Sequence, residues 1–147
     1  MYQRILVATD GSPLSRKAVR DAIGLGVSLG ASLVALNVVP RYPLSYFEGG
    51  ATVSPQEVGR IEKEWAEKAQ AIVDTVRKSA EAAGLKAKAV VARSDLVAAS
   101  IMATAKKNKC DLIVMASHGR KGISRILLGS ETQQVLTHST IPVLVLR

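Results

Sequence analysis

The residues best suited to chemistry lie in one stretch, from Asp111 to Ser130, which reads DLIVMASHGRKGISRILLGS. Its short apolar run, Leu112 to Met115, predicts a buried strand. A glycine-rich, cationic loop follows, and the stretch ends at Gly129-Ser130, where a helical pattern begins. Glycines let backbone N–H groups approach an anion, and the first N–H groups of a helix have no partner within it. This order of strand, loop and helix predicts a phosphate-binding site.

Composition limits the class of protein. The chain has 147 residues, of which 48% are apolar and 22% charged, and this predicts one soluble globular domain over residues 1–147. No apolar run reaches membrane-spanning length, and the N-terminus lacks the layout of a signal peptide. The lone Cys110 excludes an internal disulfide and argues against a cysteine-based metal site. We therefore expect a cytoplasmic protein that does not associate with membranes.

The formal net charge of +8 allows two interpretations. One is a nucleic-acid or membrane-surface partner, and the other is solvated helix faces together with a local anion site. The basic residues are scattered along the chain, and with aromatic residues at 3% no platform for base stacking interleaves with them. The composition favours the second interpretation and argues against nucleic-acid binding as the main function.

Strands and helices are expected to alternate along the whole chain. Short apolar runs predict strands at residues 4–8, 33–39, 87–91, 112–115 and 143–146. Apolar residues at spacings of three and four predict helices between these strands. The first helix is expected to have Ser12 as N-cap and to end at Gly30, the second to begin at Ser54-Pro55, and the third to be capped by Ser94-Asp95. The last helix is expected to begin with Ser130 as its capping residue.

Strands that are apolar on both faces and separated by helices require a sheet that is covered on both sides. We therefore predict a single-domain α/β fold, an open doubly wound sheet of five mainly parallel strands with helices on both faces (Rossmann-like). Ligands bind such sheets at the carboxyl ends of the strands. The segments that should converge at this edge are Ala8, Thr9 and Asp10 after the first strand, Val38 and Val39 at the end of the second, and the loop from Met115 to Gly122. The candidate site residues of this loop are Met115, Ala116, Ser117, His118, Gly119 and Arg120.

Several common active-site motifs are missing from the sequence. It contains no G-x-x-x-x-G-K-[ST] loop, no G-x-G-x-x-G after the first strand and no G-x-S-x-G elbow. A triad of Ser117, His118 and Asp10 is disfavoured, because adjacent serine and histidine residues do not easily align as nucleophile and base. We expect His118 to form hydrogen bonds within the loop.

The pattern resembles the universal stress protein family over essentially the whole chain. The family's nucleotide-binding signature is G-x-x-G, nine residues, then G-[ST], and Gly119 and Gly129-Ser130 match its spacing. The flanking S-H-G-R and L-L-G-S, the closing I-P-V-L-V-L and the first strand ending in A-T-D-G-S are also typical. One position departs from the signature, because its first glycine is Ala116 here.

The resemblance implies an adenine nucleotide as ligand: ATP, with or without Mg²⁺, or alternatively ADP or AMP. It implies that Asp10 accepts a hydrogen bond from the ribose or the adenine edge; an Asx turn or a helix cap is its other expected role, and the two roles can coexist. It implies that Val38 offers backbone groups to adenine, although a core position is equally consistent. The phosphates would meet the N–H groups of Gly119 and Gly129, the Ser130 hydroxyl and residues of the first helical turn, Glu131 and Thr132.

Three functions remain open from the sequence. The first, which the resemblance favours, is an ATP-binding stress-response regulatory protein that acts as a dimer. The second is a slow ATP hydrolase or phosphotransferase, for which the loop offers no clear carboxylate beyond Asp10 except Glu131. The third is a ligand-free dimeric adaptor, if Ala116 closes the site. The final strand has no helix after it to cover it, so we expect it to pair antiparallel with the same strand of a second copy. A further protein partner is expected but not identified.

Overall fold

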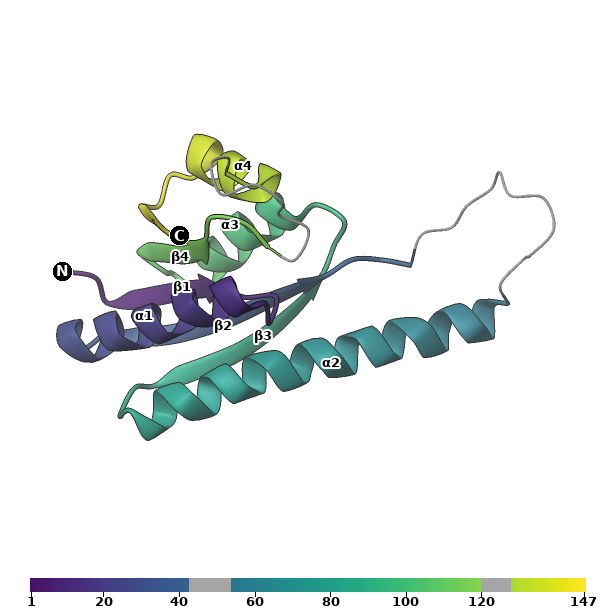
Figure 1. Cartoon of the computed structure of the whole chain (residues 1–147), viewed down its shortest axis with the longest axis horizontal. Helices are drawn as coiled ribbons and strands as arrows, with labels where there is room; N and C mark the ends of the chain where they lie inside the picture. The colour runs from purple at the N-terminus through teal and green to yellow at the C-terminus, as the bar shows by residue number, and fades with distance from the viewer. Residues whose placement is uncertain (43–53, 120–127) are drawn as a thin grey trace.

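The computed structural model describes residues 1–42, 54–119 and 128–147. In this part of the chain, strands and helices alternate as expected (Figure 1). The strands are β1 (Arg4–Ala8), β2 (Ser32–Val39), β3 (Ala87–Arg93), β4 (Leu112–Ala116) and β5 (Val143–Leu146). The helices are α1 (Pro13–Leu29), α2 (Pro55–Ala82), α3 (Val97–Lys107) and α4 (Ser130–His138).

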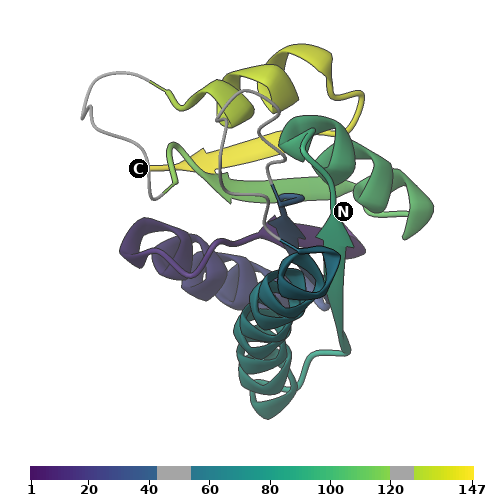
Figure 2. The same ribbon diagram turned by 90° about the vertical axis from the view of Figure 1, so that its right-hand side faces the viewer.

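The five strands form one sheet in the order β3-β2-β1-β4-β5, and each neighbouring pair is parallel. Helices α1 and α2 lie on one face of the sheet, and α3 and α4 lie on the other (Figure 2). The predicted doubly wound α/β fold is therefore confirmed. The chain proceeds outward from β1 through β2 to β3 and then returns to the other side of β1, so the direction of winding switches between β1 and β4.

Alternate residues of each strand supply two separate apolar clusters. Ile5 and Val7 of β1 belong to the cluster beneath α1 and α2. Leu6, between them, belongs to the cluster beneath α3 and α4. All three side chains are fully buried, which is the pattern of a parallel sheet covered on both faces. The core therefore holds the sheet as a rigid platform whose carboxyl edge carries the loops.

The ends of α1 agree with the helix caps predicted from the sequence, whereas the start of α3 does not. Ser12 caps α1, its side chain accepting from the N–H of Ser15, and Gly30 ends that helix at a φ of 66°, both as predicted. The predicted cap at Ser94-Asp95 is wrong, because the N-cap of α3 is Leu96, which makes no side-chain cap bond. The carboxylate of Asp95 instead accepts a hydrogen bond from the N–H of Arg41, which follows β2, at 2.9 Å. It therefore does not cap the helix.

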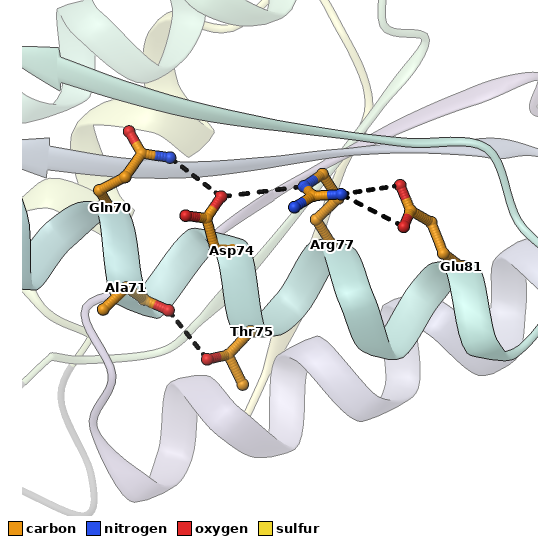
Figure 3. Close-up of polar contacts among 6 residues, drawn as sticks. All are labelled: Gln70, Ala71, Asp74, Thr75, Arg77 and Glu81. Carbon is orange, nitrogen blue, oxygen red and sulfur yellow. Dashed lines mark hydrogen bonds and ion pairs between the residues drawn. The ribbon is translucent and has the colours of Figure 1, made fainter.

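Part of the basic charge forms ion pairs on the surface of helix α2. Arg77 lies between two acidic side chains one turn away on either side, with its Nη1 3.1 Å from Glu81 and its Nε 3.8 Å from Asp74 (Figure 3). Gln70 also donates to Asp74, at 3.0 Å. Pairs at these spacings on a solvated helix contribute only a few tenths of a kcal/mol each, roughly 0.2–0.5. They fit the interpretation that this charge belongs to helix surface.

Helices long and apolar enough to cross a membrane are absent from the described residues.

Candidate functional site

The candidate site lies at the carboxyl edge of the sheet, where the winding switches between β1 and β4. The N–H of Thr9 donates to the carbonyl of Leu36 at 2.9 Å, which keeps the end of β1 against β2. The N–H of Ser117 donates to the carbonyl of Leu146 at 2.7 Å, which likewise keeps the end of β4 against β5. The loops that follow β1 and β4 therefore leave the sheet from two fixed and adjacent points.

These two loops meet at Asp10 and Gly119. Asp10 is half-buried, and its Oδ1 accepts from the N–H of Ser12 at 2.9 Å, the Asx turn expected as one of its roles. A Cβ built on Gly119 would lie 2.6 Å from Oδ2 of Asp10. The carboxylate of the first loop therefore lies against the bare Cα of the second. The sequence predicted that these two loops meet at one edge of the sheet, but not this contact.

A buried hydroxyl network supports the turn that carries Asp10. The Oγ1 of Thr9 lies 3.0 Å from the Oγ of Ser15 and accepts from the N–H of Gly11 at 3.2 Å. Ser15 in turn donates to the carbonyl of Ser12 at 3.0 Å. Gly11 has a φ of 79°, which favours glycine. Ser15 was not among the residues expected at the site, although a serine three residues after an N-cap serine is the signal that could have identified it.

The start of α4 differs from the prediction. Gly129, rather than Ser130, is the N-cap, so the predicted cap at Ser130 is wrong: Ser130 is the first helical residue, and its hydroxyl donates to Oε2 of Glu131 at 3.0 Å. The N–H of Gly129 donates to the carbonyl of Ser117 at 2.7 Å, so it is engaged within the protein. The N–H groups left without a partner inside the helix belong to Ser130, Glu131 and Thr132.

Thr132 and Ala116 join α4 to the end of β4. Thr132 is 2% exposed, and its Oγ1 donates to the carbonyl of Ala116 at 3.0 Å, so its hydroxyl faces the protein. Ala116 is an extended strand residue, 7% exposed, and it belongs to the apolar cluster beneath α1 and α2. The alanine at the signature's first glycine position therefore places its methyl group in the core.

The other expected site residues lie as follows. Ala8 and Val38 are half-buried at the ends of β1 and β2 and pack against the cluster beneath α3 and α4, to which the buried Met115 also belongs. The Oγ of Ser117 lies 3.2 Å from Nδ1 of His118, which is the loop hydrogen bond expected of this histidine. Arg120 lies outside the described residues.

Titratable groups of the described residues suggest neither a metal centre nor a reactive thiol. No group of three or more His, Cys, Asp or Glu side chains there could hold a metal ion. Cys110 is buried, and this burial raises the pKa of its thiol to about 11. The cysteine therefore behaves as a small apolar residue next to β4.

Comparison with known proteins places the chain in a family. The model of the universal stress protein family matches residues 1–147. Universal stress protein MJ0531 of Methanocaldococcus jannaschii is 34% identical over 147 residues, covering 100% of this chain and 83% of the relative. YxiE, a universal stress protein of Bacillus subtilis, is 31% identical over 149 residues, covering 100% of both chains.

Solved structures agree with this assignment. The structure of the M. jannaschii protein MJ0577 superimposes with a TM-score of 0.83 at 26% identity, covering 99% of this chain and 96% of that one. A universal stress protein in complex with cAMP superimposes with a TM-score of 0.69 at 27% identity, covering 99% and 97%. The family signature around Gly119 and Gly129, the fold and the sequence matches agree: the chain belongs to the universal stress protein family.

Proposed function

We propose that this chain binds an adenine nucleotide, ATP in the first place, and serves as a cytoplasmic stress-response regulatory protein. The observation that carries the proposal is the contact between Asp10 and Gly119, beside the N-terminus of α4. It brings an acceptor for a nucleoside and a donor set for phosphates to the switch point, which is the usual ligand crevice of this sheet type.

The phosphates are assigned to the first turn of α4. The N–H groups of Ser130, Glu131 and Thr132 have no partner within the helix, and the helix dipole adds positive potential at this end. Ser130 and Glu131 are exposed, so this end of the helix is accessible. A Mg²⁺ ion would bind through the phosphates of the nucleotide, since the described residues supply no cluster of their own.

The nucleoside is assigned to the ends of β1 and β2. Asp10 is the acceptor for the ribose hydroxyls or the adenine edge, and the backbone of Val38 faces the base. A relative of 27% identity that was solved in complex with cAMP supports an adenine nucleotide as the ligand class. Neither ADP nor AMP is distinguished from ATP by these contacts, so all three are compared in the test below.

Assembly is proposed to use β5. Among the described strands it is the last of the sheet, with β4 as its one neighbour, and its Leu144 is 39% exposed. An apolar edge strand invites pairing with another strand, and a two-fold axis lets the same strand of a second copy supply it. We therefore propose an antiparallel homodimer through β5.

Calorimetry on matched glycine variants tests the phosphate site. A Cβ at Gly129 would lie 3.3 Å from two backbone atoms, the carbonyl oxygen of Ser117 and the Cα of His118, so Gly129→Val displaces the start of α4. Gly59 has open space around it on the surface of α2, which makes Gly59→Val the control. We expect wild type and Gly59→Val to bind ATP equally, and Gly129→Val to bind it more weakly than either.

Two outcomes would contradict the proposal. If the wild type binds none of ATP, ADP and AMP in the presence of Mg²⁺, the function is wrong and the ligand-free adaptor takes its place. If Gly129→Val remains folded, as shown by urea denaturation, and binds ATP like the wild type, the phosphate site is not at α4.

A further inference from the structure

We propose that Gly119 is a positioning residue for Asp10: its missing side chain leaves room for the carboxylate that recognises the nucleoside. This inference rests on the proposed function and assigns Gly119 to nucleoside rather than phosphate recognition. Under it, the two glycines of the signature serve different parts of one ligand, Gly119 the sugar and base through Asp10, and Gly129 the phosphates through α4.

The requirement for glycine at position 119 is steric. The positive φ angles of glycines in the described residues occur at Gly11, Gly30 and Gly84, so a left-handed φ is not the reason for glycine at position 119. The space, in contrast, is restricted. A Cβ at this position would lie 2.6 Å from Oδ2 of Asp10, closer than the 3.0 Å below which a neighbour has to move.

Asp10 is the group that has to move. Apart from Gly119 and its chain neighbours, its Oδ2 and Cγ, at 2.6 and 3.8 Å, are the only atoms of the described residues within 4 Å of the position that the Cβ would take. Gly119 itself is exposed, so core packing among the described residues does not oppose a side chain there. An alanine at 119 would therefore act on the protein through the carboxylate of Asp10.

The Asp10 carboxylate cannot move without losing a hydrogen bond. Its Oδ1 accepts from the N–H of Ser12, and Ser12 is the N-cap of α1, with its Oγ accepting from the N–H of Ser15 at 3.3 Å. A rotation that takes Oδ2 away from a Cβ also takes Oδ1 away from this N–H. The Asx turn therefore orients the carboxylate, and the bare Cα of Gly119 leaves the room that Oδ2 occupies in this orientation, which is the preorganisation that selective binding needs.

The test measures the binding of adenosine and of ATP to the wild type, Gly119→Ala, Asp10→Ala and the double variant, with Gly59→Ala as the control. Gly119→Ala should weaken the binding of adenosine and of ATP by the same factor, roughly tenfold for one misplaced charge-assisted hydrogen bond. Asp10→Ala removes the atoms that the new Cβ would meet. In that background Gly119→Ala should therefore have no further effect, and Gly59→Ala should bind both ligands like the wild type.

The outcomes separate this inference from the proposed function. Loss of ATP affinity in Gly119→Ala with unchanged adenosine affinity would show that Gly119 serves the phosphates, and would overturn the positioning role alone. Equal fractional losses from Gly119→Ala with and without Asp10 would overturn it as well, because the glycine would then act independently of the carboxylate. No binding of either ligand by the folded wild type would refute the proposed function and this role with it.

Discussion

Thr132→Val removes the hydrogen bond that joins α4 to the end of β4. The Thr132 side chain is 2% exposed and its Oγ1 donates to the carbonyl of Ala116 at 3.0 Å. Valine keeps the shape of threonine but cannot donate. A net hydrogen bond contributes about 0.5–1.5 kcal/mol, and a buried acceptor left without its partner costs about 1–3 kcal/mol. We expect Thr132→Val to lower the free energy of unfolding by about 1–3 kcal/mol.

Thr132→Ser is the matched control, because it keeps the donor and loses one methyl group, at a cost of about 0.8 kcal/mol. Urea denaturation compares the two variants. With m values of about 1–3 kcal/mol/M for proteins of this size, the midpoint for Thr132→Val should fall by about 1 M with m unchanged. Calorimetry should show weaker ATP binding for Thr132→Val than for Thr132→Ser, since the hydrogen bond places the first turn of α4.

A Thr132→Val protein as stable as the wild type would refute this role of the hydroxyl, and so would a Thr132→Ser protein that loses more stability than Thr132→Val. Either result would mean that the methyl group, rather than the hydroxyl, joins α4 to the sheet. A stability loss without any change in ATP affinity would keep the hydrogen bond but remove its link to the site.

Two further predictions concern assembly and pH. Leu144 is 39% exposed, whereas the neighbouring Val143 and Val145 pack against the cluster beneath α3 and α4. Leu144→Lys therefore adds a charge to the β5 edge that stays exposed in the monomer. Light scattering should show a dimeric wild type and a monomeric Leu144→Lys, and a monomeric wild type at micromolar concentration would contradict the proposed dimer. Burial alone would raise the pKa of Asp111, but backbone N–H groups of Arg4 and Gln3 donate to it and lower the pKa below its ordinary value of 3.8. Because the pKa is lower in the folded protein, the ionised Asp111 stabilises the fold at pH values above its ordinary pKa, and this stabilisation is lost as the pH falls through the pKa of the folded state. Asp111→Asn should therefore be less stable than the wild type at pH 7, and this difference should shrink in acid. A difference that does not depend on pH would contradict this.

Local signals in the sequence were sufficient to predict the strands, the helices and the class of fold. The runs of β-branched and aliphatic residues mark the strands, and the spacing of apolar residues marks the helices between them. Ser12 and Gly30 were predicted correctly at the ends of α1 because a helix cap depends on residues within one turn. The parallel sheet covered on both faces followed from strands that are apolar on both sides.

Local signals failed where a distant group competed for the same atoms. Asp95 was expected to cap α3, but it accepts from Arg41. Gly129 was expected to offer its N–H to phosphate, but it donates to the carbonyl of Ser117. The hydroxyl of Thr132 was expected to reach the ligand, but it bonds to Ala116. In each case the partner is distant along the chain, so only packing decides the choice.

The sequence by itself determined which residues could form a nucleotide site, since the glycine spacing and the A-T-D-G-S turn can both be read from it. Only the tertiary structure decided how they meet. The strand order puts β1 beside β4, and this pairing brings the carboxylate of Asp10 against the bare Cα of Gly119. It also buries the methyl group of Ala116 in the core. Residue spacing encodes which face of a strand or helix is apolar, whereas the contact between two loops depends on the order and register of strands far apart in the chain.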